Sequence, residues 1–172
     1  MGDAGVSVVR GDGLAGEEGY EVFCAAADAE EVFDTLVTRG MNAPPFGYRT
    51  WETLTLEAGT PLFGPEIAGR LPTAVGLARL APDAPAADRR LVGLRCDALP
   101  GAGATVRLDG EAVGTVTRAV ESPDREEPIA LALVESQERT LAVEAGAEAV
   151  AAERVALPFV EGSERSARLP TY

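Results

Sequence analysis

The sequence contains no histidine and no lysine, so all 15 of its basic residues are arginines. Without histidine, a Ser-His-Asp triad, a histidine metal site and an imidazole base are excluded. Without lysine, Schiff-base chemistry and a P-loop lysine are excluded. Any chemistry in this chain therefore depends on carboxylates, arginine, tyrosine, hydroxyls or thiols, or on groups from another chain.

Cysteine and long apolar runs are also scarce. The two cysteines, Cys24 and Cys96, fit no metal-binding spacing, and we expect free thiols in a reducing, cytoplasmic environment. No apolar run reaches the length needed to cross a membrane, and we expect no leader segment. The 172 residues suffice to bury a core without disulfides or metal.

Acidic residues dominate the charge, giving a net charge of −13 and a pI of about 4.4. An acidic surface repels phosphate, so a nucleic-acid partner is not expected. A lysine-free, acidic composition rich in Ala and Gly is typical of proteins from a high-salt cytoplasm. A GC-rich genome is the competing explanation for the same composition.

The segment 47–67 organises the rest of the chain. It predicts a helix after Pro44 and Pro45, ending where Gly59 can adopt the left-handed conformation and Pro61 prevents continuation. The expected apolar stripe of this helix consists of Tyr48, Trp51, Leu54 and Ala58.

Glu57 is unusual in the last turn of this helix, where the helix dipole favours a cation. Two interpretations follow from the sequence. The carboxylate is solvated beside a nearby arginine, or it is held there by a specific partner.

The N-terminal segment predicts two strands, 6–10 and 20–25, joined by a glycine-rich loop. The loop contains a literal G-x-G-x-x-G at Gly11, Gly13 and Gly16, but a strand follows where a dinucleotide site requires a helix. We therefore interpret it as a wide hairpin loop. Asp28 and Glu31 form a capping-box pattern that predicts a helix over 29–39, ending at Gly40.

The C-terminal segment predicts short strands after a Pro- and Asp-rich boundary at 82–88. Asp109-Gly110 is a strong hairpin signal. The segment 149–155 is ambiguous between strand and helix, because its Ala-Ala-Glu-Arg centre also favours helix. Six strands are expected, at 91–96, 104–108, 111–120, 128–134, 139–143 and 149–157. The predicted fold class is α+β, with a two-strand, two-helix region over 1–82 followed by a small antiparallel β-barrel over 88–172.

Three segments, in this order, resemble the second half of the aminomethyltransferase superfamily. That superfamily includes the T-protein of glycine cleavage and the YgfZ-type folate-binding proteins. The first motif begins at Gly16 and reads Gly-Glu-Glu-Gly-Tyr-Glu-Val-Phe. The second begins at Leu54 and reads Leu-Thr-Leu-Glu-Ala-Gly-Thr-Pro-Leu-Phe-Gly. The third begins at Arg90 with Arg-Leu-Val-Gly-Leu and continues in barrel segments at 114–117, 122–123 and 129–132. They cover nearly the whole chain, and the resemblance implies a folate pocket between the α+β region and the barrel.

The resemblance places Glu21 on the glutamate that contacts the pterin of tetrahydrofolate, where a carboxylate can accept two parallel hydrogen bonds. Trp51 and Tyr172 could provide apolar walls for the ring. The sequence also departs from the family. Trp51 stands where the T-protein has an arginine, the YgfZ-type signature K-G-C-x-x-G-Q-E is absent, and the half of the T-protein with its substrate-side aspartate has no counterpart.

Three functions remain open from the sequence. The first is a non-catalytic, YgfZ-like protein that binds a folate and serves iron–sulfur proteins. The second is half of a split aminomethyltransferase that transfers a one-carbon unit to tetrahydrofolate. The third is an interaction module without a ligand. The expected partners are a folate-type molecule and either a chain carrying the N-terminal half or a second copy of this chain.

Overall fold

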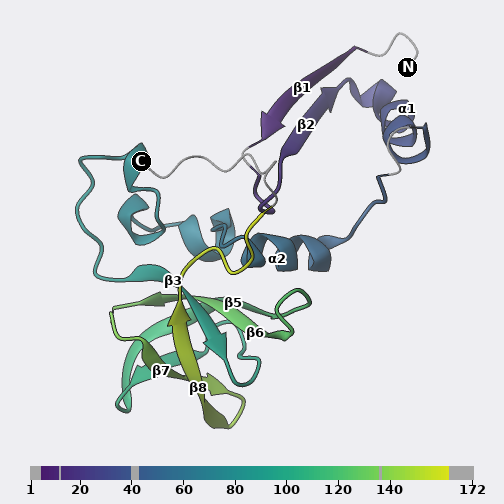
Figure 1. Ribbon diagram of the computed structural model, residues 1–172. Coiled ribbons are helices and arrows are strands. Elements are labelled where there is room, and N and C mark those ends of the chain that lie inside the picture. Colours follow the sequence, from purple (N-terminus) through teal and green to yellow (C-terminus); the bar gives the residue numbers. More distant parts are fainter. Residues whose placement is uncertain (1–4, 12, 40–42, 136, 163–172) are drawn as a thin grey trace.

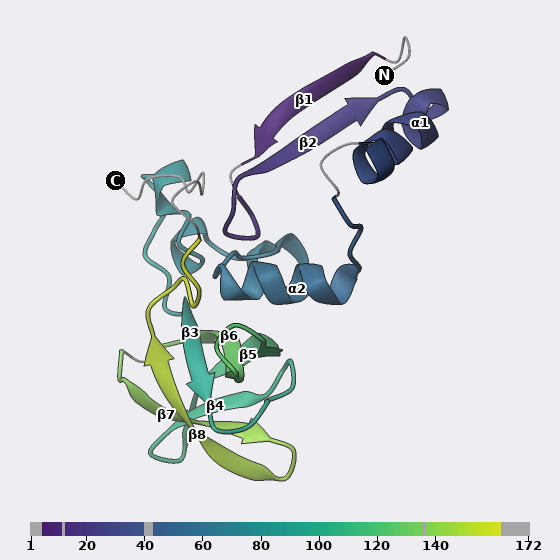
Figure 2. The same ribbon diagram turned by 45° about the vertical axis from the view of Figure 1, so that its right-hand side comes forward.

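The computed structural model describes residues 5–11, 13–39, 43–135 and 137–162. Figure 1 shows a two-stranded hairpin at one end of the molecule and a closed barrel at the other, with helix α2 (Tyr48–Glu57) between them. Figure 2 shows the same arrangement from a second direction, so α2 lies between the hairpin and the barrel in both views. The predicted α+β class, with an antiparallel barrel after a two-strand region, is confirmed.

The hairpin consists of β1 (Val6–Gly11) and β2 (Gly19–Cys24), paired antiparallel from Val6↔Cys24 to Gly11↔Gly19. As predicted, the glycine-rich loop joins two strands, and no helix follows it directly. Cross-strand partners share a face, so Val9 lies beside Glu21 on one face and Val8 beside Val22 on the other.

The helix expected over 29–39 is divided into shorter pieces. A 3₁₀ turn (Ala26–Asp28) leads into α1 (Ala29–Asp34), and a π-helical turn (Thr35–Arg39) follows. The predicted capping box is wrong, because the Asp28 side chain makes no capping hydrogen bond. The preceding turn gives Asp28 helical backbone angles, whereas a capping residue needs an extended conformation. The predicted stop at Gly40 lies outside the described residues.

Helix α2 ends as predicted. Gly59 adopts φ +67°, its N–H donates to Leu56 O at 2.8 Å, and Thr60 N donates to Thr55 O at 2.9 Å. This hydrogen-bonded left-handed turn caps the last carbonyls of the helix. The predicted apolar stripe is wrong at Tyr48, which is exposed; the buried residues are Thr55, Leu56 and Glu57, near the C-terminal end. The C-terminal end of the helix packs on the barrel through Leu56.

The segment between α2 and the barrel is irregular. It contains a π-helical turn, η3 (Phe63–Ile67), and two 3₁₀ turns, η4 (Pro72–Ala74) and η5 (Ala78–Leu80). Thr73 Oγ1 donates to Pro85 O at 2.7 Å and ties the middle of the segment to the part just before the barrel.

The barrel has six strands in the order β3-β6-β5-β4-β7-β8, and pairing of β8 with β3 closes it. Every predicted strand is present, and 149–155, left open between helix and strand, is strand. Asp109 (φ 50°) and Gly110 (φ 88°) form the predicted tight turn. The strands are β3 (Arg90–Cys96), β4 (Thr105–Leu108), β5 (Glu111–Ser122), β6 (Glu127–Val134), β7 (Thr140–Ala145) and β8 (Glu148–Val155).

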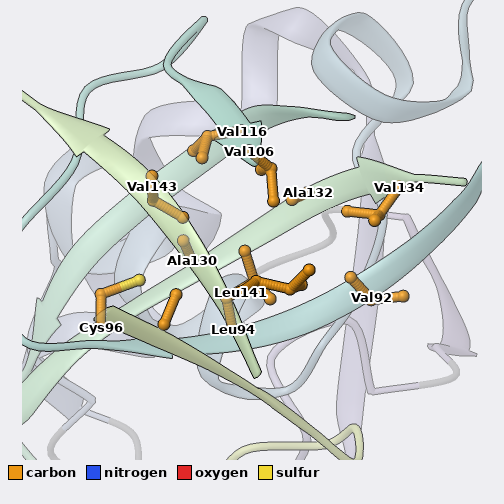
Figure 3. Close-up of a cluster of buried hydrophobic side chains, with 11 residues drawn as sticks. Val92, Leu94, Cys96, Val106, Val116, Ala130, Ala132, Val134, Leu141 and Val143 are labelled. Carbon is orange, nitrogen blue, oxygen red and sulfur yellow. The ribbon is translucent and has the colours of Figure 1, made fainter. Parts of the chain in front are cut away.

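Two apolar clusters hold this part of the chain. One fills the barrel interior, where the labelled side chains of Figure 3 gather from several strands, including Val92, Leu94, Val106, Val116 and Val143. The other lies between α2 and the barrel, and consists of Leu56, Ile129, Leu131 and Phe159. The second cluster attaches α2 to the barrel, and so fixes where its remaining surface points.

Candidate functional site

A buried ion pair locks the loop after α2 to the barrel. Glu66 in η3 is fully buried, and the Arg118 side chain on β5 is 11 % exposed. Arg118 Nε lies 3.0 and 3.2 Å from the two carboxylate oxygens of Glu66, and Leu62 N donates to Glu66 at 2.8 Å. Arg118 also donates to Thr55 Oγ1 at 3.0 Å and to Thr60 O at 2.7 Å. All three nitrogens of the guanidinium are therefore engaged by residues of α2 and the loop that follows it.

Glu57 makes a second connection to the barrel. Its side chain is buried, and Ser122 Oγ at the end of β5 donates to its carboxylate at 2.5 Å. The backbone carbonyl of Glu57 accepts from Phe159 N and Val160 N at 2.9 and 3.0 Å. Of the two interpretations of Glu57, the specific partner is correct and the solvated carboxylate is wrong. The signal was present in the sequence, since a carboxylate is unfavourable at this end of a helix.

With its C-terminal end held in this way, α2 presents Trp51 and Leu54 to the loop of the hairpin. A cavity of about 400 Å³ lies there. Loop and strand residues of the hairpin form one side of it, and α2 together with Phe46, two residues before the helix, forms the other. The lining consists of Gly11, Gly13, Leu14, Ala15, Glu17, Glu18, Gly19, Tyr20, Glu21, Phe46, Trp51 and Leu54. We call this cavity the hairpin pocket.

The hairpin pocket combines carboxylates with aromatic side chains. The Glu18 carboxylate pairs with Arg10 Nε at 3.0 Å. It also accepts a hydrogen bond from the Tyr20 hydroxyl at 2.7 Å, and this hydrogen bond raises the pKa of Tyr20. Glu21 is exposed, and no hydrogen bond or ion pair joins it to another of the described residues. The described lining includes no arginine. Such a pocket suits a flat molecule with several N–H donors, and it repels an anion.

The structure brings together two of the three residues predicted from the sequence. Glu21 and Trp51 line the same pocket, although they lie on different elements. Tyr172 lies outside the described residues. The sequence analysis missed Tyr20 and Phe46 as lining aromatics. Tyr20 directly precedes Glu21 within the first motif, and that position could have identified it.

Other features of the described residues are less suited to chemistry. A larger cavity of about 790 Å³ lies between the 65–89 segment and the barrel, but Arg89, one of its charged lining residues, is already paired with Glu135 at 2.8 Å. Cys96 is a free thiol whose pKa burial raises to about 11, so it is unreactive near neutral pH. The described residues contain no cluster of metal-ligating side chains, and none of their helices could span a membrane.

Two family models match consecutive parts of the chain. The model described as "GCVT N-terminal domain" matches residues 2–81, and the "Glycine cleavage T-protein C-terminal barrel domain" matches residues 89–161. The chain belongs to the aminomethyltransferase superfamily. The resemblance stated from the sequence is thereby confirmed.

Individual relatives agree with this assignment. The Deinococcus deserti aminomethyltransferase is 38 % identical over 72 % of this chain and 37 % of its own length. The Thermus thermophilus aminomethyltransferase is 40 % identical over 86 % of this chain and 46 % of its own length. The crystal structure of the Bartonella henselae glycine cleavage aminomethyltransferase shares the fold, with a TM-score of 0.77 and 22 % identity over 91 % of this chain and 50 % of that one. The chain thus spans about half the length of the aminomethyltransferases it matches.

Proposed function

We propose that this chain supplies the folate-binding part of an aminomethyltransferase, and that the one-carbon transfer to tetrahydrofolate takes place only together with the half of the family that the chain lacks. The observation that carries the proposal is the position of Glu21 and Trp51 on one pocket. The family resemblance, which assigns the pterin contact to Glu21, supports it independently. The division into a folate-binding region over 1–82 and a barrel over 88–172 is part of the same proposal.

The chemistry of the hairpin pocket fits the head group of a reduced folate. The pterin is flat and carries neighbouring N–H donors, which the Glu21 carboxylate can accept side by side. Trp51, Tyr20 and Phe46 offer ring faces for stacking. The dianionic glutamate tail of a folate does not suit this lining, because it includes three carboxylates, from Glu17, Glu18 and Glu21. The tail is therefore expected to leave the pocket.

In this arrangement the residues of the chain bind and orient the folate ring, while the ligands carry the reacting one-carbon unit. Glu21 holds the donor edge of the ring, and Trp51 excludes water from one side of it. In the T-protein, the substrate-side aspartate belongs to the half that this chain lacks. The whole reaction thus depends on that half.

A non-catalytic, YgfZ-like protein that binds a folate and serves iron–sulfur proteins is the second candidate. Trp51 favours it, because tryptophan replaces the arginine of the T-protein and cannot make a fork of charged hydrogen bonds. The relatives named above favour the first candidate, because they are aminomethyltransferases. An interaction module without a ligand is the third, and it predicts no folate binding at all.

The test is titration of the chain with 5-formyltetrahydrofolate at high salt, followed by calorimetry and by the fluorescence of Trp51, the only tryptophan. We expect weak binding to the chain alone, because half a pocket leaves the ligand partly in water. Binding should tighten when the missing half is added. Glu21→Gln should weaken binding about 10- to 100-fold, the worth of a charged hydrogen bond.

Glu52→Gln is the matched control, since Glu52 is an exposed glutamate next to Trp51 that does not line the hairpin pocket. Unchanged binding by Glu21→Gln would remove Glu21 from the site. Tight binding by the isolated chain would show that the pocket does not need the missing half to bind the ligand. Binding without any transfer by the completed protein would select the YgfZ-like candidate.

A further inference from the structure

The N-terminal half of α2 carries a wall of the hairpin pocket but has few local features that stabilise it. Gly47, at the N-cap position, has no side chain that could cap the first turn. Arg49 stands in that turn, where the helix dipole favours an anion, and Tyr48 is 87 % exposed. Trp51 lies at the end of this turn and lines the pocket. The turn would fray unless a contact from elsewhere in the protein held it.

A buried hydroxyl supplies that contact. Thr55, one turn after Trp51, is 0 % exposed. Its Oγ1 donates to the carbonyl oxygen of Trp51 at 2.9 Å, and it also lies 3.2 Å from Glu52 O. The same Oγ1 accepts a hydrogen bond from Arg118 Nη1 at 3.0 Å. The hydroxyl thus joins the backbone of Trp51 to a side chain of the barrel.

The direction of these hydrogen bonds follows from the groups that make them. A guanidinium has only donors, so the Thr55 oxygen must accept from Arg118. A hydroxyl carries one proton, which is left for the carbonyl oxygens of the helix. Arg118 is itself fixed by both carboxylate oxygens of Glu66, at 3.0 and 3.2 Å. A charged donor and a buried site strengthen the bonds of such a series.

We propose that Thr55 is a positioning residue of the hairpin pocket. Its hydroxyl transmits the fixed position of Arg118 to the backbone of Trp51, and this holds the Trp51 ring in the wall of the pocket. Thr55 is not one of the described residues that line the pocket, so it acts through Trp51. The proposal rests on the proposed function for its ligand, a flat ring that stacks on Trp51. The series of hydrogen bonds does not depend on any ligand.

The experiment compares three variants of the full chain. Thr55→Val keeps the shape of the side chain and removes the hydroxyl, whereas Thr55→Ser keeps the hydroxyl. Thr53→Val is the matched control, because Thr53 Oγ1 donates to Arg49 O at 3.0 Å, the same backbone contact on the same helix. Arg118 donates to Thr55 rather than to Thr53, and Thr53 does not line the hairpin pocket.

Trp51 is the only tryptophan, so its fluorescence reports the pocket wall directly. Acrylamide quenching and anisotropy of Trp51 are measured in the folded variants without any ligand. We expect Thr55→Val to raise the quenching constant and lower the anisotropy, because losing one hydrogen bond increases the population of an opened turn about 2- to 10-fold. Its affinity for 5-formyltetrahydrofolate should fall by about the same factor, since the wall is no longer preorganised. Thr55→Ser and Thr53→Val should resemble the wild type.

The fluorescence separates a positioning role from a merely structural one. A lower melting temperature of Thr55→Val with unchanged quenching and anisotropy of Trp51 would overturn the proposal. An equal change in Thr53→Val would overturn it too, because the loss of any hydroxyl bonded to this helix would then explain the effect. If circular dichroism shows that Thr55→Val does not fold, Thr55→Cys takes its place, because a thiol is only a weak donor and acceptor.

The proposed function can fail separately from the role of Thr55. Changed Trp51 fluorescence in Thr55→Val, with no binding of 5-formyltetrahydrofolate to the wild type with or without the missing half, would contradict the proposed function and support the positioning role. Binding to the wild type, with the same affinity and the same Trp51 fluorescence in Thr55→Val, would support the proposed function and overturn the positioning role.

Discussion

Removing Glu66 should be among the most damaging single changes in the connection between α2 and the barrel. Glu66 is 0 % exposed and pairs with Arg118, whose side chain is almost as well buried. Glu66→Ala leaves a guanidinium with no carboxylate in a buried site, and it also removes the acceptor of Leu62 N. Breaking a buried pair by removing one partner costs about 3–5 kcal/mol. That is a large fraction of the stability of a typical domain.

The assay is urea unfolding at constant high salt, because urea carries no charge that would screen the ion pair. Trp51 fluorescence follows α2, and far-ultraviolet circular dichroism follows the barrel strands. We expect both transitions to move to lower urea in Glu66→Ala. The Trp51 transition should move further, because the pair joins the loop after α2 to β5.

Two further variants separate charge from volume. Glu66→Gln keeps the shape and one acceptor, so it should recover only part of the loss. The double variant Glu66→Leu with Arg118→Met removes both charges, and it should be more stable than Glu66→Ala, since an apolar replacement of a buried pair is often neutral or stabilising.

The control is Glu144→Ala, which breaks the half-exposed pair of Glu144 with Arg107 at 2.7 Å. A surface pair of this kind is worth about 0–1 kcal/mol. If Glu66→Ala costs no more than Glu144→Ala, the buried pair is not what holds α2 on the barrel, and the reasoning is refuted.

Two further predictions concern charge. The melting temperature should rise with KCl into the molar range, because the net charge of −13 repels itself and the screening length falls from about 30 Å at 0.01 M salt to about 3 Å at 1 M; maximal stability in dilute buffer would contradict the high-salt interpretation of the composition. Hydrogen bonding from Arg139 lowers the pKa of Glu153, so its stabilisation is present above the ordinary carboxyl pKa and is lost as the pH falls through the folded-state value. The melting temperature of Glu153→Gln should therefore fall less than that of the wild type between pH 7 and about pH 3. An equal fall would show that Glu153 does not contribute to the loss of stability in acid.

The strands could be predicted because their signals are local. The alternation of apolar residues and the Asp109-Gly110 turn lie within a few residues of one another, and the structure forms them as expected. The cap at Asp28 failed because a short 3₁₀ turn before the helix changes its backbone, and nothing in the capping pattern reports that turn.

The pair of Glu66 and Arg118 could not be predicted. Each is an ordinary charged residue in the sequence, far from the other along the chain, and only the packing of α2 on β5 brings them together. The residues of the hairpin pocket were predicted in another way. Glu21 came from the family resemblance and Trp51 from its place in the central helix, and neither position follows from local periodicity.

Helix α2 links the barrel to the hairpin pocket, because one end of it is attached to the barrel and its outer side lines the pocket. Its C-terminal end is fixed to the barrel by Leu56, by the hydrogen bond of Glu57 with Ser122 and by the contacts of Arg118 with the following loop. Its outer side carries Trp51 into the hairpin pocket. The position of this wall is therefore determined by barrel residues that never touch the pocket. The opposite wall belongs to a hairpin with free edges and exposed apolar faces. One wall fixed by the barrel and an opposite wall left partly uncovered are consistent with the proposal that the rest of an aminomethyltransferase completes this pocket.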